Sequence, residues 1–316
     1  MKRILNYTIT EQDAGKSVTD FLRSRGFSRH LLIAIKQAGP ASPDCSDKDI
    51  KPLVLVNHQA VRMNTLLVSG DTVQAELPEE ASSEHIPPVR LPLDIIYEDE
   101  GLLVLNKPYD MPIHPSIGNY ENTLANALAW YYQEKGESFI FRCINRLDRD
   151  TSGLLIVAKN ALSGAILSDQ MKRREIHREY IAVVKGIAPE RGVIDAPIAR
   201  ANDSVIKRCV DLEHGDHAVT HFQRLAVGTI SNHSYSLLSV HLETGRTHQI
   251  RVHMNHIGHP LPGDFLYCPD YTDFKRQPLH SPCLKFKHPI TGENLQFESD
   301  VPEDFHPEFF KQSHII

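Results

Sequence analysis

A short stretch rich in proline, glutamate and serine divides this chain and limits what it can fold into. It runs from Pro78 to Pro92 and includes the pair Pro87-Pro88. Such composition is typical of a linker, because proline restricts the backbone and charged side chains have little apolar surface to bury. The sequence therefore predicts a small N-terminal unit at residues 1–78, a linker at 79–92 and a larger unit at 93–316.

The larger unit has strand patterns that come in pairs. Apolar or alternating runs of strand length occur at residues 95–97, 102–106, 154–158, 180–184, 219–224 and 235–242. Helical spacing predicts helices at about 124–135, 161–174 and 247–257, and Asn160 is a good cap for the second. Because strands do not alternate regularly with helices, we predict an α+β fold whose sheet is mixed and largely antiparallel.

Composition sets outer limits on the function. The chain has 316 residues, of which 41% are hydrophobic, so a sizeable core is possible. No apolar run approaches the roughly 20 residues of a membrane helix, and the N-terminus lacks the apolar stretch of a secretory signal. Five widely spaced cysteines suit free thiols in a reducing compartment. We therefore expect a cytoplasmic protein without a membrane partner.

The charge pattern allows nucleic acid as a partner. The net charge of −6 counts mildly against it, because phosphate binding is largely electrostatic. Basic side chains nevertheless cluster in two places that could form a phosphate-binding rim, although each cluster could also be an ordinary solvated face. The first cluster contains Arg142, Arg146 and Arg149, and the second contains Lys172, Arg173, Arg174, His177 and Arg178.

The most informative segment is Asn145-Arg146-Leu147-Asp148-Arg149-Asp150-Thr151-Ser152-Gly153, which leads into an apolar run. Asp148 therefore stands in a loop that feeds a buried strand, a usual place for a catalytic group. Arg146 and Arg149 should keep its carboxyl ionised, because nearby cations favour the charged form. Taken alone, the segment would more often be a structural ion pair.

Two later segments also carry chemistry-bearing side chains. Arg178 to Gly186 has a strand pattern that places Tyr180 on one face. Thr244-Gly245-Arg246-Thr247-His248-Gln249-Ile250-Arg251-Val252-His253 follows a predicted strand and looks like the start of a helix, with Arg246 in its first turn. An unpaired cation is unfavourable near a helix N-terminus, so Arg246 is expected to have an acidic partner.

In order and spacing, these segments resemble the motifs of the RluA family of pseudouridine synthases. The resemblance extends from about Leu93 to Phe297 and includes a closing segment at 279–293. One departure is Asn145, where the family usually has histidine. The resemblance implies an isomerase that converts uridine in RNA to pseudouridine, with Asp148 as the catalytic aspartate, Tyr180 against the flipped uracil ring and Arg246 paired with Asp148.

Several further expectations follow from this resemblance. The reaction is an isomerisation without redox change, so it requires no cofactor, and we expect no metal site and no obligate protein partner. Large-subunit ribosomal RNA is the first expectation for the substrate, and transfer RNA is the alternative. Asp148 could act as a covalent nucleophile or as a base. Residues expected to contact the RNA are Arg146, Arg149, Thr151, Lys172, Arg173, Arg174, Arg178, His248 and Arg251.

The N-terminal unit predicts two short helices and a small hairpin. One helix is ended by Gly26 and the other lies between Ser28 and Gly39, while strands are expected at 53–56 and 72–77. This order resembles the alpha-L RNA-binding module of ribosomal proteins. The segment Pro40 to Pro52 is an insertion relative to that module, and the unit lacks a marked basic excess.

Two other classes of function compete with this interpretation. Histidines at 248, 253, 256 and 259, followed by Asp264, could indicate a metal-dependent hydrolase. However, no His-Glu-x-x-His or paired-cysteine spacing is present, and these histidines would fall on different helical faces. A non-catalytic RNA-binding or ribosome-assembly protein is the second competitor, although it would have no chemical need for Asp148, Tyr180 and Arg246 together.

Overall fold

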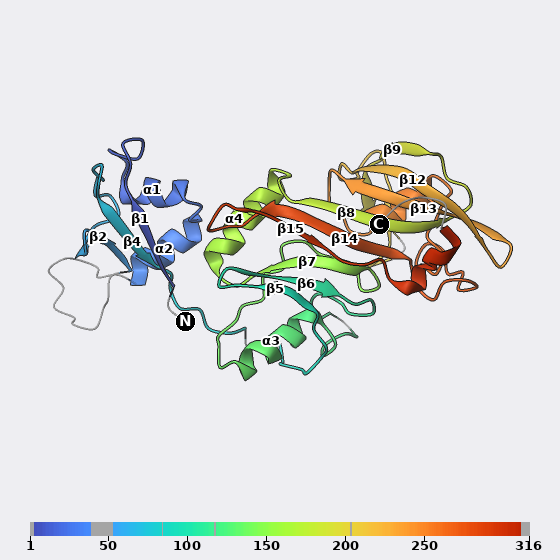
Figure 1. Ribbon diagram of the computed structural model, residues 1–316, viewed down its shortest axis with the longest axis horizontal. Coiled ribbons are helices and arrows are strands. Elements are labelled where there is room, and N and C mark those ends of the chain that lie inside the picture. The colour runs from blue at the N-terminus through green and yellow to red at the C-terminus, as the bar shows by residue number, and fades with distance from the viewer. Residues whose placement is uncertain (1–2, 39–52, 84, 117, 203, 311–316) are drawn as a thin grey trace.

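The computed structural model describes residues 3–38, 53–83, 85–116, 118–202 and 204–310. A small N-terminal unit lies at one end of the molecule, and a long twisted sheet extends away from it (Figure 1). The inserted segment Pro40 to Pro52 lies outside the described residues. The fold is α+β, as predicted.

The N-terminal unit is a four-stranded antiparallel sheet covered by two helices. The strands lie in the order β1 (Ile4–Thr8), β4 (Thr72–Glu76), β2 (Val54–Val56) and β3 (Gln59–Ala60), and the helices are α1 (Val18–Ser24) and α2 (Arg29–Ala38). Asn57 and His58, which connect β2 to β3, both have positive φ, which suits a tight hairpin. β1 and β3 were not predicted, because both are short and lack a clear alternating pattern.

The second sheet contains nine of the described strands, and its order does not follow the sequence. Its path is β5 (Ile95–Glu98), β6 (Leu102–Lys107), β7 (Ser152–Ala158), β14 (Leu279–Lys287), β8 (His177–Lys185), β13 (His233–Leu242), β12 (Val219–Ile230) and β9 (Arg191–Asp195), with β15 (Asn294–Glu298) paired to β14. β7 and β14 pair in parallel, and the other described pairs are antiparallel. The predicted mixed, largely antiparallel sheet is therefore confirmed.

Shorter elements complete the larger unit. The helices are α3 (Leu124–Glu134), α4 (Ala161–Lys172) and α5 (Gln249–His256), and Asn160 caps α4 as predicted by accepting from the Ser163 amide. α5 begins two residues later than the predicted 247. A two-stranded sheet pairs β10 (Ile198–Arg200) with β11 (Arg208–Val210), and two 3-10 helices, η1 (Glu303–Phe305) and η2 (Pro307–Phe310), follow β15.

Strand β7 lies near the middle of the large sheet and is buried along its whole length. Gly153 near its start has φ of +115°, and a β-carbon there would be 2.4 Å from the carbonyl oxygen of Ser281. Only glycine allows β14 to approach this closely. The loop that carries Asp148 therefore enters a rigid, tightly packed part of the sheet.

The segment predicted to be a linker lies along the larger unit. Asn126 of α3 donates to the carbonyl of Pro87 at 2.7 Å, and Arg142 forms an ion pair with Glu80. Ile86 and Leu91 pack against the main hydrophobic cluster of the large sheet. This segment therefore contacts the larger unit through specific side chains along much of its length.

The two units also touch through their apolar surfaces. Leu162 of α4 is buried in the same cluster as the core of the N-terminal unit, with Ile166 and Ile290 at its edge. Gly26 lies against the side chain of Ile166, where a β-carbon would be only 2.4 Å from the nearest Ile166 atom. In the part of the chain that the structure describes, no helix is long and apolar enough to cross a membrane.

Candidate active site

Asp148 lies in the loop immediately before β7, and buried polar groups fix this loop. The amide of Thr151 donates to the Asp148 carbonyl at 3.2 Å. Asn145 is only 2% exposed, accepts from the Ile156 amide at 2.8 Å and donates to the Leu154 carbonyl at 3.3 Å. A primary amide provides both a donor and an acceptor, so Asn145 can tie the loop to β7.

Asp148 was expected to pair with Arg246, but in the structure its arginine partner is Arg251. The Arg251 guanidinium donates from Nη1 to Asp148 Oδ2 at 2.8 Å. It also forms two bonds with Asp264, from Nε at 2.7 Å and from Nη2 at 2.8 Å. Arg251 is 2% exposed, so it lies beneath the site and is also not part of the expected RNA-binding rim.

The helix boundary explains this correction. Because α5 begins at Gln249, Arg251 lies within the helix beside the buried Ile250, whereas Arg246 lies in the preceding turn. Arg246 is directed away, with Nε 3.1 Å from the carbonyl oxygen of His217 and Nη1 3.4 Å from Asp216. Its side chain is 42% exposed.

The electrostatic environment keeps the Asp148 carboxyl ionised. Burial alone would raise the pKa of Asp148, but the charge of Arg251 and the hydrogen bond that it donates outweigh this effect, so the pKa is lowered. Its side chain retains 26% exposure, so a ligand can reach it. Asp148 is thus an anchored, partly accessible carboxylate.

A buried lysine, which the sequence analysis did not single out, holds the same loop from below. Lys107 at the end of β6 is 1% exposed, and its ammonium donates to the carbonyls of Pro108 at 2.7 Å, Met111 at 2.9 Å and Arg149 at 2.9 Å. Burial lowers the pKa of Lys107 to about 7, and the charge of Asp148 opposes this shift. The only sequence signal was its place at the end of a strongly apolar strand.

His248 lies beside the ion pair, in a left-handed conformation with φ of 58°. Its Nδ1 is 3.1 Å from the Tyr267 hydroxyl, which already accepts from the Arg208 amide at 2.9 Å. Burial lowers the pKa of His248, with Asp148 acting in the opposite direction, so the ring is neutral near pH 7.

Tyr180 lies on the face of β8 that belongs to the main hydrophobic cluster. That cluster also contains Leu147, the residue immediately before Asp148. Tyr180 is 4% exposed, so little of its ring is open to a ligand in this conformation. On the same strand, Arg178 has a guanidinium nitrogen 3.7 Å from the position that a β-carbon would take on Gly245. The segment that contains Tyr180 and the segment that runs from Thr244 to His253 therefore meet in space.

The basic cluster around Asp148 is only partly available for phosphate. Arg146 is exposed, whereas Arg149 forms an ion pair with Asp150 at 2.9 Å. Thr151 is 2% exposed, and its hydroxyl accepts from the side-chain amide of Gln277 at 3.2 Å. The predicted contact of Thr151 with RNA is therefore not supported by its position.

The second basic cluster lies around the end of α4. Arg173 forms an ion pair with Asp169 at 3.0 Å and Arg174 forms one with Glu243 at 2.8 Å. Lys172 is exposed and has no acidic partner among the described residues. Acidic neighbours therefore neutralise much of this cluster.

The histidines that could have indicated a metal site have other partners. His253 is fully buried between the Thr220 hydroxyl at 2.9 Å and the Ala196 carbonyl at 2.8 Å, and His259 lies 2.9 Å from the Lys185 carbonyl. Among the described residues, no group of three or more His, Cys, Asp or Glu side chains is arranged to hold a metal ion.

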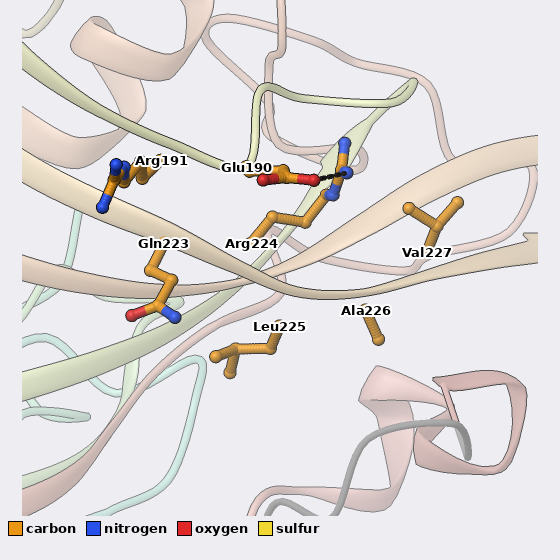
Figure 2. A pocket seen from close by; sticks show the side chains of 7 residues that line it. All are labelled: Glu190, Arg191, Gln223, Arg224, Leu225, Ala226 and Val227. Carbon is orange, nitrogen blue, oxygen red and sulfur yellow. Dashed lines mark ion pairs between the residues drawn. The ribbon is translucent and has the colours of Figure 1, made fainter.

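An open hollow of about 680 Å³ lies at a β-bulge in the middle of β12, shown in Figure 2. It is formed by the bulge and the end of the β8–β9 connection, with the Glu190–Arg224 ion pair across it. Neither Asp148 nor Arg251 lines it, so we do not assign the chemistry to it. The lining residues are Glu190, Arg191, Gln223, Arg224, Leu225, Ala226 and Val227.

Comparisons with known proteins agree on one family. A family model described as RNA pseudouridylate synthase matches residues 101–256. Uncharacterized RNA pseudouridine synthase YjbO of Bacillus subtilis (strain 168) is 41% identical over 91% of this chain and 96% of its own length. Ribosomal large subunit pseudouridine synthase D of Vibrio cholerae is 39% identical over 79% of this chain and 80% of its own length.

A solved structure gives the same picture. Human RNA Pseudouridylate Synthase Domain Containing 1 has a TM-score of 0.57 and 27% identity, and the match covers 73% of this chain and 89% of that one. The matched region of the family model contains Asp148, Tyr180 and Arg251.

Proposed function

Because this chain belongs to the RluA family of RNA pseudouridine synthases, and therefore isomerises uridine in RNA, we propose that its substrate is large-subunit ribosomal RNA and that Asp148 performs the chemistry. The observation that carries the proposal is the anchored carboxylate of Asp148, paired with the buried Arg251. The name of the Vibrio cholerae relative supports the choice of RNA. Transfer RNA is the alternative substrate.

The reaction needs one reactive carboxylate and no external group. The bond between N1 of uracil and C1′ of ribose breaks, and the base rotates. C5 then bonds to C1′ and loses its proton, while N1 gains a proton, so the product is an isomer of uridine. Asp148 acts at the ribose, either by attacking C1′ or by removing a proton to give a glycal. Both routes require an ionised carboxyl, and the lowered pKa of Asp148 meets that requirement at neutral pH.

The target uridine must leave its base stack to reach Asp148. Extrusion costs about a few kcal/mol and is cheapest in loops, which are also the usual targets of sequence-specific RNA recognition. Tyr180 supplies an aromatic surface on the same side of the sheet as Leu147, although its ring must become more exposed to contact uracil. The exposed Arg146 and Lys172 are the proposed phosphate contacts.

We propose that three segments of the chain have different roles. Residues 1–78 bind RNA as an alpha-L-like module, residues 79–92 connect the units, and residues 93–316 carry the catalytic domain. The separate sheet of the N-terminal unit supports this division. The described cysteines, Cys143, Cys209, Cys268 and Cys283, are all free thiols, which supports a cytoplasmic location.

The decisive experiment is a transcriptome-wide pseudouridine map of cells that lack the gene, complemented with wild type or Asp148→Asn. We expect one or more large-subunit sites to return with wild type and to stay unmodified with Asp148→Asn, because the neutral amide can neither attack nor accept a proton. RNA binding by the purified variant should persist. Full modification by Asp148→Asn would overturn the residue assignment, and sites confined to transfer RNA would overturn the substrate.

A further inference from the structure

Phe265 is an exposed aromatic residue whose backbone is held firmly beside the active site. Its side chain is 41% exposed. The preceding residue, Asp264, is fully buried and bound by Arg251, and one of its carboxylate oxygens accepts from the amides of Leu266 at 3.0 Å and Tyr267 at 3.3 Å. The Phe265 ring is therefore presented from a fixed backbone.

Two guanidinium groups lie against this ring. The central carbon of Arg149 is 5.3 Å from the ring centroid, and that of Arg251 is 5.5 Å from it. Arg251 binds Asp148 directly, and Arg149 follows Asp148 in the sequence. Phe265 therefore lies close to the reactive carboxylate of Asp148. Such distances are typical of cation–π contact, and the 41% exposure of the side chain leaves part of it open to a ligand.

We propose that Phe265 is a base-stacking residue that holds an unpaired nucleotide next to the extruded uridine. This inference rests on the proposed function. An exposed aromatic ring beside guanidinium groups is the usual surface on which unpaired bases stack, and a lone exposed phenylalanine elsewhere would need no such explanation. Arg149, which is 44% exposed, can contact the phosphate or the second base at the same position.

Stacking predicts a particular kind of specificity. Every base has a π-face, so Phe265 discriminates weakly between base identities but strongly between an unpaired flanking nucleotide and a paired one. By stacking with the neighbour, the ring also occupies the gap left when uridine is extruded. The site would therefore select the loop structure around the uridine.

The test uses single-turnover kinetics on an RNA oligonucleotide. The oligonucleotide contains a uridine whose modification in cells depends on the gene, as identified by the pseudouridine map. Stacking on one base predicts that Phe265→Ala raises the half-saturating enzyme concentration by about 5- to 150-fold, while the maximal rate changes little. Phe265→Trp should behave like wild type and Phe265→Leu like the alanine variant. Phe309→Ala, at a 45% exposed residue in η2, is the matched control and should have no effect.

A second measurement separates stacking from a structural role. An abasic nucleotide is placed next to the target uridine, first on one side and then on the other. On the side where the base stacks on Phe265, the abasic nucleotide should raise the half-saturating concentration of wild type by the same factor as Phe265→Ala does. The same RNA should cause no further loss in the Phe265→Ala variant. Additive losses, full rescue by Phe265→Leu, or unchanged Phe265→Ala kinetics would each overturn the inference. A wild-type protein that modifies no RNA would instead overturn the proposed function.

Discussion

At the scale of single residues, the site depends on one buried arginine that the motif alone did not distinguish from its neighbour. Arg246 and Arg251 lie in the same segment, and both have acidic residues within reach. The difference arises because Asp264, 13 residues further along, is fully buried and binds Arg251 through both carboxylate oxygens. A contact between distant segments of this kind is not visible in local sequence patterns.

Replacing the two arginines separately tests this correction. Arg251→Gln should lower the free energy of unfolding by about 3–5 kcal/mol, because it leaves the buried Asp264 without a counter-charge. It should also raise the pKa of Asp148, so that activity is lost at a higher pH on the acid side. Denaturant titrations and pH–rate profiles check both effects.

Arg246→Gln is the matched control, because the Arg246 side chain is half-exposed and its guanidinium contacts the His217 carbonyl and the exposed Asp216. Its unfolding free energy and the acid side of its pH–rate profile should stay close to wild type. If Arg246→Gln shifted the acid side of the pH–rate profile and Arg251→Gln did not, Arg246 would be the functional partner of Asp148 after all.

At the scale of elements, most of the strands and helices could be predicted, but their order could not. The predicted strands from Ile95 to Leu242 all exist, because their apolar runs and alternation reflect burial that is local in sequence. β14 was missed, since proline and histidine interrupt its pattern, and yet it is the strand that joins β7 to β8. Sheet order results from distant pairing.

Lys107, at the end of β6, holds the loop residues whose carbonyls it binds, and its buried ammonium predicts how stability depends on pH. Its pKa is lowered from 10.5 to about 7 in the folded protein. Between these values the unfolded chain binds more protons, so the free energy of unfolding gains up to about 1.4 kcal/mol per pH unit as pH rises. Lys107→Met should flatten this increase, as measured by denaturant unfolding from neutral to alkaline pH.

The control for Lys107 is Lys172→Met at an exposed position, which should keep the wild-type dependence on pH. Equal slopes for wild type and Lys107→Met would show that Lys107 remains protonated in the folded state. In that case, the three carbonyls that it contacts stabilise the ammonium more than burial destabilises it.

At the scale of the whole molecule, binding to RNA must overcome a net charge of −6. Many basic side chains near the site are already paired with acids, as Arg173 is with Asp169 and Glu175. Composition could not reveal which cations are free, because that depends on which acids the fold brings near them. Arg146, exposed beside the Asp148 loop, remains available.

The salt dependence of RNA binding should therefore reveal the free cations. Arg146→Gln should reduce the slope of log affinity against log salt by about 0.7–0.9, since one fewer counterion is released. Arg173→Gln should change the slope less, because its charge is already balanced. Filter binding or anisotropy between about 50 and 200 mM salt checks this, and equal effects of the two variants would contradict it.

The contacts from Asp148 through Arg251 to Asp264 also limit when, during synthesis of the chain, the carboxylate can be held in place. Asp148 precedes Arg251 by 103 residues, so its partner leaves the ribosome much later than it does. A nascent or truncated polypeptide carries the carboxylate without the guanidinium that holds it in place. The ion pair that holds the Asp148 carboxyl can therefore form only after the first 251 of the 316 residues have been synthesised.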